Sequence, residues 1–122
     1  MGVTWHGNYF RYLEHARAEL LDMIGYNHRE MVASGYHWPI VDARIKYIKP
    51  TTYGQRLKVI ATLEEYENRL KIAYSITDRV SGEVVTTAFT IQAAVSKADG
   101  EMCFCSPRAL VDKVHACLAS MR

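Results

Sequence analysis

The sequence predicts an α+β domain in which an antiparallel sheet packs against one long helix. Two observations predict it. Apolar residues near the start recur every three or four positions, which is typical of one face of a helix, and beyond residue 40 they alternate with polar ones, which is typical of strands. The helical segment precedes a run of strands joined mainly by tight turns, an order that favours a meander with the helix on one face.

The first predicted element is a helix over residues 8–24. Asn8 is suitable as its N-cap, and Gly25 as the glycine that ends it. A helix of this length spans about 25 Å, enough to cross a small sheet. Its apolar face comprises Tyr9, Leu13, Ala16, Leu20 and Ile24. Residues 26–39 are expected to form an irregular connection.

Strands are predicted by alternation and by β-branched residues. They cover residues 40–48, 57–64, 70–76 and 85–95, with a short one at 102–104. Turns are expected at Asn68-Arg69, at residues 78–82 and at Asp99-Gly100. A terminal helix is predicted from Pro107 to about Ala119. The inward positions are expected to be Leu57, Val59, Ala61 and Leu63, then Leu70, Ile72, Tyr74 and Ile76, then Val85, Thr87, Phe89, Ile91, Ala93 and Val95.

Length and composition exclude several classes of protein. The chain has 122 residues, which indicates one domain, and an apolar content of 49%, which is ordinary for a folded soluble protein. A net charge of +2 is too weak to indicate nucleic-acid binding, and no apolar run is long enough to suggest a membrane span. Three cysteines without metal-ligand spacing and no signal-like N-terminus favour a reducing, cytoplasmic location.

The most specific motif is the run from Gly2 to Phe10, Gly-Val-Thr-Trp-His-Gly-Asn-Tyr-Phe, at the start of the helix. A helix N-terminus offers unpaired backbone N–H groups that bind an anion or polarise a carbonyl oxygen. The run resembles the Gly-Val-Val-x-His-x-Asn-Tyr signature of the 4-hydroxybenzoyl-CoA thioesterase-like branch of hotdog-fold proteins. Residues 40–54 resemble the family's strand ending in Pro-x-x-Tyr-Gly-Asp, with Gln55 in place of the acid, and Pro107-Arg108-Ala109-Leu110 resembles its closing segment.

This resemblance implies a hotdog fold, a curved antiparallel sheet wrapped around a central helix, and hydrolysis of an acyl-CoA or acyl-carrier-protein thioester without a cofactor or metal. In the family an aspartate stands three residues before the glycine of the motif. Counted back from Gly2, it falls two positions before Met1. We therefore expect residues 1–122 to form a single hotdog domain that lacks the family's N-terminal strand and catalytic-aspartate loop.

The resemblance also assigns roles near the helix start. The backbone N–H of His6 is expected to donate to the thioester oxygen, and its imidazole is suited to proton transfer because its pKa lies near neutral. A local hydrogen bond of the ring is the alternative. Glu14 is a second candidate acid, since some hotdog branches use a helical glutamate. An ion pair of Glu14 with Arg17 or Arg11 is the preferred interpretation.

Substrate-binding candidates fall into an apolar and a basic group. Val3, Trp5 and Tyr9 are suited to line an acyl pocket, although the same aromatics suit a core or a dimer interface. Arg69 and Lys71 near a hairpin are candidates for binding the CoA phosphates, as are Arg44, Lys46 and Arg108. The histidines lack ligand spacing, so no metal site is expected.

Hotdog subunits pair through their sheets, so the resemblance implies a homodimer or homotetramer. Two other functions stay open. One is a hotdog dehydratase acting on a 3-hydroxyacyl thioester, and the other is a protein that binds acyl thioesters without turnover, which the missing aspartate would explain. Binding without hydrolysis would separate the last from both enzymes.

Overall fold

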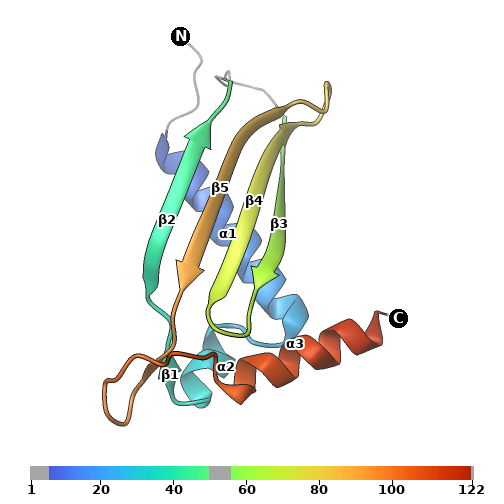
Figure 1. Cartoon of the computed structure of the whole chain (residues 1–122). Helices are drawn as coiled ribbons and strands as arrows, with labels where there is room; N and C mark the ends of the chain where they lie inside the picture. Colours follow the sequence, from blue (N-terminus) through green and yellow to red (C-terminus); the bar gives the residue numbers. More distant parts are fainter. Residues whose placement is uncertain (1–5, 50–55, 122) are drawn as a thin grey trace.

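The structure, a computed structural model, describes residues 6–49 and 56–121, with side chains from residue 11 onward. A four-stranded antiparallel sheet in the order β2-β5-β4-β3 carries the long helix α1 along one face (Figure 1). This arrangement confirms the predicted α+β class. The elements are α1 (His6–Ile24), α2 (His28–Ala33), β1 (Tyr36–His37), β2 (Ile40–Tyr47), β3 (Leu57–Glu65), β4 (Leu70–Asp78), β5 (Val84–Gln92), β6 (Val95–Ser96) and α3 (Arg108–Ser120).

The first helix begins earlier than predicted. It starts at His6, so Asn8 lies inside its first turn and the prediction of Asn8 as N-cap is wrong. An N-cap residue lies just outside the helix, where its own backbone is not helical. The backbone N–H groups of the first turn therefore begin at His6.

The end of α1 agrees with the prediction. Gly25 has a φ of +87°, and its N–H donates to the carbonyl of Asp22 at 3.1 Å. The N–H of Tyr26 donates to the carbonyl of Leu21 at 2.9 Å. These two bonds form a Schellman motif, whose left-handed position strongly favours glycine. The chain then turns sharply into α2.

Residues 26–39 are more ordered than predicted. They contain the short helix α2, whose N-cap Asn27 accepts a hydrogen bond from the backbone N–H of Glu30 at 3.1 Å. They also contain β1, which pairs with β6 in a separate two-stranded sheet. A six-residue helix is too short to show a helical period, and β1 depends on a strand about sixty positions away.

The core lies between α1 and the central strand β4. The β4 side chains predicted to point inward are all buried, which confirms that face. They are Leu70, Ile72, Tyr74 and Ile76, and they belong to one core with Leu13, Leu21 and Ile24 of α1. On β3 the predicted inward residues are half-buried and pack against the same core.

The predicted face of β5 is wrong over most of the strand. Its residues Thr86, Ala88, Thr90 and Gln92 lie opposite the inward residues of β4, and directly paired residues share a face. The predicted residues Thr87, Phe89 and Ile91 therefore lie on the face away from α1. Both faces of this strand lack charged side chains, so alternation alone did not distinguish them. The strand also ends at Gln92, because Val95 belongs to β6.

The strand order is also not the predicted simple meander. β2 pairs with β5 rather than with its sequence neighbour β3, so β2 and β3 form opposite edges of the sheet. The strand predicted at 102–104 is reduced to one bridge between Val95 and Met102. The terminal helix is present as α3, and it buries Leu110 and Val114.

Candidate functional site

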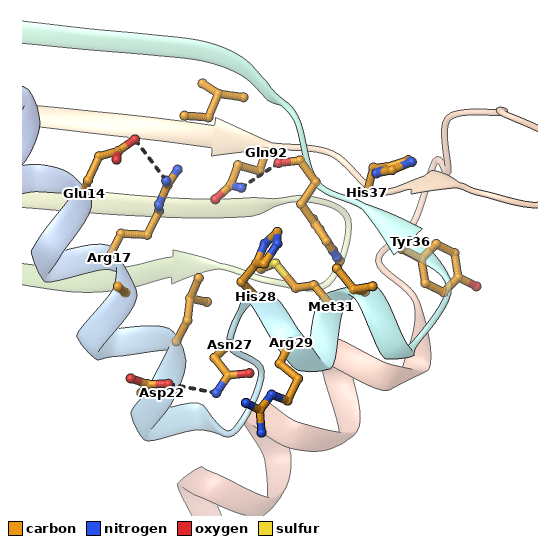
Figure 2. A pocket seen from close by; sticks show the side chains of 15 residues that line it. Glu14, Arg17, Asp22, Asn27, His28, Arg29, Met31, Tyr36, His37 and Gln92 are labelled. Carbon is orange, nitrogen blue, oxygen red and sulfur yellow. Dashed lines mark hydrogen bonds and ion pairs between the residues drawn. The ribbon is translucent and has the colours of Figure 1, made fainter.

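A cavity of about 850 Å³ lies between α1, α2 and the beginning of β2 (Figure 2). Its volume falls within the range of roughly 300–1,000 Å³ that is usual for small-molecule sites. Arg17 and Leu21 border it from α1, His28 and Met31 from α2, and Gln92 from the end of β5. The turn at Gly25 lies between these walls, because it ends α1 three residues before α2 begins.

A chain of hydrogen bonds holds one wall of the cavity. The indole Nε1 of Trp38 donates to the Tyr26 hydroxyl at 3.1 Å, and this hydroxyl lies 2.7 Å from Ser34 Oγ. Ser34 in turn donates to the carbonyl of Met31 at 2.7 Å. The rings of Tyr26 and Trp38 meet edge to face at 5.9 Å. Each donor in this chain of hydrogen bonds has an acceptor. The chain therefore holds the end of α2 and the residues just before β2 in a fixed relative position.

Glu14 and Arg17 lie where the large cavity meets a second, smaller hollow. They form the predicted ion pair, with 3.4 Å between Glu14 Oε1 and an Arg17 guanidinium nitrogen. The Glu14 side chain is 71% exposed and that of Arg17 is 20% exposed. A pair this open to water contributes only about 0–1 kcal/mol. The Glu14 carboxylate therefore remains available to a ligand.

The smaller hollow, of about 60 Å³, lies between α1 and the edge strand β2. Leu13, Ala43 and Ile45 give it apolar sides. Tyr74 and Thr90 also line it, and their hydroxyl oxygens lie 3.0 Å apart. Burial raises the pKa of the Tyr74 phenol above its ordinary value, so this group is a neutral hydroxyl at physiological pH.

The helix start that is predicted to bind the thioester oxygen is the first turn of α1. His6 is the first helical residue, and first-turn N–H groups have no partner within a helix. Glu14 follows eight residues later on α1, about 12 Å along the axis. The side chains of His6 and Tyr9, and the whole of Val3 and Trp5, lie outside the described part of the structure.

Two of the predicted phosphate-binding cations, Arg69 and Lys71, lie away from this helix start, whereas Arg44 and Lys46 lie on β2. Arg69 pairs with Glu65 at 2.9 Å, and Lys71 pairs with Glu64 at 3.3 Å and lies over the ring of Phe89. They lie at the β3–β4 hairpin, at the end of the sheet near the C-terminus of α1 (Figure 1). One protomer therefore does not bring them to His6, and neither borders the large cavity. Their role in binding CoA stays a prediction.

Sequence reasoning missed the residues that shape the cavity. His28, Arg29 and His37 stand exposed at its border, and Gln92 is buried in it. A glutamine at the end of a strand segment without charged residues was the one available signal, because a buried amide needs polar partners. The others come from segments whose elements the sequence did not reveal.

Three further findings concern the part of the chain that the structure describes. Within it, no group of three or more His, Cys, Asp or Glu side chains could hold a metal ion. None of its helices combines the length and the apolar character that crossing a membrane requires. All three cysteines are free thiols.

Comparison with known proteins agrees with this architecture. A family model described as the thioesterase-like superfamily matches residues 1–111. This chain is 35% identical to the Bacillus subtilis (strain 168) protein YneP over 74 residues, which are 61% of this chain. YneP is named as a proposed acyl-CoA thioesterase. This chain spans only 53% of the length of YneP in that match.

Solved structures have the same fold. The 1,4-dihydroxy-2-naphthoyl-CoA (DHNA-CoA) thioesterase of Staphylococcus aureus superposes with a TM-score of 0.77 at 25% identity, covering 99% of this chain and 80% of its own. A complex of 4-hydroxybenzoyl-CoA thioesterase superposes with a TM-score of 0.75 at 18% identity, covering 93% and 86%, which is a likeness of fold alone. The chain has the hotdog fold of these enzymes and belongs to the thioesterase-like superfamily.

Proposed function

We propose that this protein hydrolyses acyl-CoA thioesters to the free acid and CoA. The observation that carries the proposal is the family match over residues 1–111. The geometry supports it, because α1 carries both a helix start, whose first N–H groups have no partner within the helix, and the accessible Glu14 carboxylate at the border of the cavity. An acyl-carrier-protein thioester is the alternative substrate, since it presents the same thioester.

We assign the oxyanion contact to the backbone N–H of His6. Losing one such donor typically costs about a hundredfold to a thousandfold in rate. His6→Ala keeps the backbone donor, whereas Gly7→Pro removes a first-turn N–H and alters the helix start. Thiol release from a panel of acyl-CoAs should fall much further in Gly7→Pro than in His6→Ala. Near-complete loss in a folded His6→Ala variant would assign the reaction to the ring instead.

The carboxylate that attacks, or activates water, has two candidates. One is the aspartate that the family carries three residues before the glycine of its motif, and the other is Glu14, which borders the cavity. Glu14→Gln should lower kcat by about a hundredfold or more if Glu14 is the general base. Glu19→Gln, at another exposed glutamate of α1, is the matched control. Full activity of Glu14→Gln, together with higher activity of an N-terminally extended chain, would select the upstream aspartate. Binding without hydrolysis by both chains would show a binding protein.

We also propose a homodimer, with a homotetramer as the larger assembly, formed by joining sheets at their edges. Supporting it, β2 is an edge strand, and Ile40 and Val41 on it are exposed apolar residues. Unprotected edge strands of this kind pair with other chains. The three free thiols fit a reducing, cytoplasmic location.

A further inference from the structure

Arg17 stands on α1 where the large cavity meets the smaller hollow, and it lines both of them. Its guanidinium points from the helix toward the sheet (Figure 2). The side chain is only 20% exposed, so most of the charge is withdrawn from water. A buried charge requires a paired anion or several hydrogen-bond acceptors, because the loss of its hydration is costly.

The structure gives Arg17 little compensation for this burial. Among the described residues its one partner is Glu14, whose exposed carboxylate lies 3.4 Å from a single guanidinium nitrogen. A guanidinium carries five N–H donors, and this contact uses one of them. Tyr74 lies near enough to interact electrostatically with Arg17, but burial raises the pKa of its phenol, which is therefore neutral at physiological pH. Arg17 thus keeps most of its donors for a second anion.

The smaller hollow extends from Arg17 toward the helix start, because its other α1 residues, Leu13 and Glu14, precede Arg17. Leu13 on the helix and Ala43 and Ile45 on β2 give it apolar sides. Its volume of about 60 Å³ is several times the roughly 10–15 Å³ that one water molecule needs, so part of an alkyl chain fits in it. The hollow is therefore suited to an alkyl chain whose far end meets a cation.

The distance along α1 decides which acyl groups reach Arg17. The helix begins at the end of the sheet where β2 ends (Figure 1). Leu13 and Arg17 follow His6 by seven and eleven residues, which places the hollow about 10–16 Å along the helix axis from its start. A short or aromatic acyl group whose thioester is held at the helix start ends before this distance. An extended alkyl chain of medium length covers it.

We propose that Arg17 binds a carboxylate at the far end of the acyl chain, so that the substrates are monothioesters of medium-chain dicarboxylic acids. This rests on the proposed thioesterase function, with the thioester at the helix start, and names its substrate class. Arginine binds carboxylates through two parallel N–H···O bonds, which are shorter and stronger than the single long contact with Glu14. A chain with a neutral end forgoes these charge-assisted bonds and binds less tightly.

The test measures binding, so it does not depend on turnover. Thioethers of CoA, which cannot be hydrolysed, are prepared with butyl and decyl chains that end in a carboxylate or in a carboxamide of the same size. Calorimetry gives their affinities. With the decyl chain, the wild type should bind the carboxylate about tenfold to a hundredfold more tightly than the carboxamide, the size of a charge-assisted hydrogen bond. With the butyl chain the two should bind equally, because that chain does not reach Arg17.

Three variants assign the preference to one side chain. Arg17→Gln should abolish it, because a neutral amide replaces the cation. Arg17→Lys should retain part of it, since the charge remains but the two-pronged geometry is lost. Arg11→Gln is the matched control and should retain all of it, because it makes the same change of charge at an exposed residue of α1 that lines neither the large cavity nor the smaller hollow.

Equal affinities of the wild type for the two decyl analogues, or no binding of either, would overturn the proposal even if Arg17→Gln fails to fold. An unchanged preference in a folded Arg17→Gln variant, or an equal preference with butyl and decyl chains, would place the carboxylate elsewhere and overturn it as well. The expected preference without hydrolysis of any acyl-CoA would refute the thioesterase proposal and leave this one standing. Rapid hydrolysis of acyl-CoAs without the preference would do the reverse.

Discussion

Removing the Tyr26 hydroxyl should destabilise the cavity wall by a predictable amount. Tyr26 is 1% exposed, and its hydroxyl accepts the only hydrogen bond that the structure gives to Trp38 Nε1. Tyr26→Phe keeps the ring and its edge-to-face contact but leaves the indole N–H buried without an acceptor. Such a loss costs about 1–3 kcal/mol. For a domain of this size it lowers Tm by roughly 3–15 °C.

The measurement is urea unfolding followed by tryptophan fluorescence, with thermal unfolding as the second probe. Tyr36→Phe is the matched control, because Tyr36 borders the same cavity and its hydroxyl makes no hydrogen bond with the described residues. Its free energy of unfolding should stay within about 0.5 kcal/mol of the wild type. Equal stabilities of the two variants would refute the argument that the hydrogen-bonded chain holds the wall.

Three other variants test separate parts of the structure. Gly25→Ala should lower the free energy of unfolding by about 1–2 kcal/mol, because φ at this residue is +87°, and a loss below about 0.5 kcal/mol in urea unfolding would contradict this. Because the pKa of Tyr74 is raised in the folded protein, the phenol of the unfolded chain loses its proton at a lower pH than that of the folded chain. The contribution of Tyr74 to the free energy of unfolding is therefore constant below about pH 10 and is lost as the pH rises toward the folded pKa. Stability of Tyr74→Phe should therefore fall less steeply than that of the wild type in alkaline unfolding curves, and parallel curves would argue against it. Sedimentation should show a dimer at micromolar concentration that Val41→Lys weakens, and a stable wild-type monomer would rule out edge-to-edge pairing.

Local pattern was sufficient wherever a segment carries its own period. The 3.6-residue repeat of α1, the glycine after it and the alternation on β3 and β4 were all predicted correctly. The resemblance of the opening motif then led to the thioesterase-like family, which the comparison confirms. Helical spacing predicted the ion pair of Glu14 with Arg17, because residues three apart on a helix are neighbours.

The sequence by itself thus determined the class of fold, the family and the end of the first helix, because each depends on residues close together in the chain. Tertiary structure decided which face of β5 turns inward, where β2 pairs and how α2 and β1 form, since these depend on partners far away in sequence. The same holds for the cavity. Gln92 and Trp38 lie 54 positions apart, and only folding brings the amide to the carbonyl that fixes its orientation.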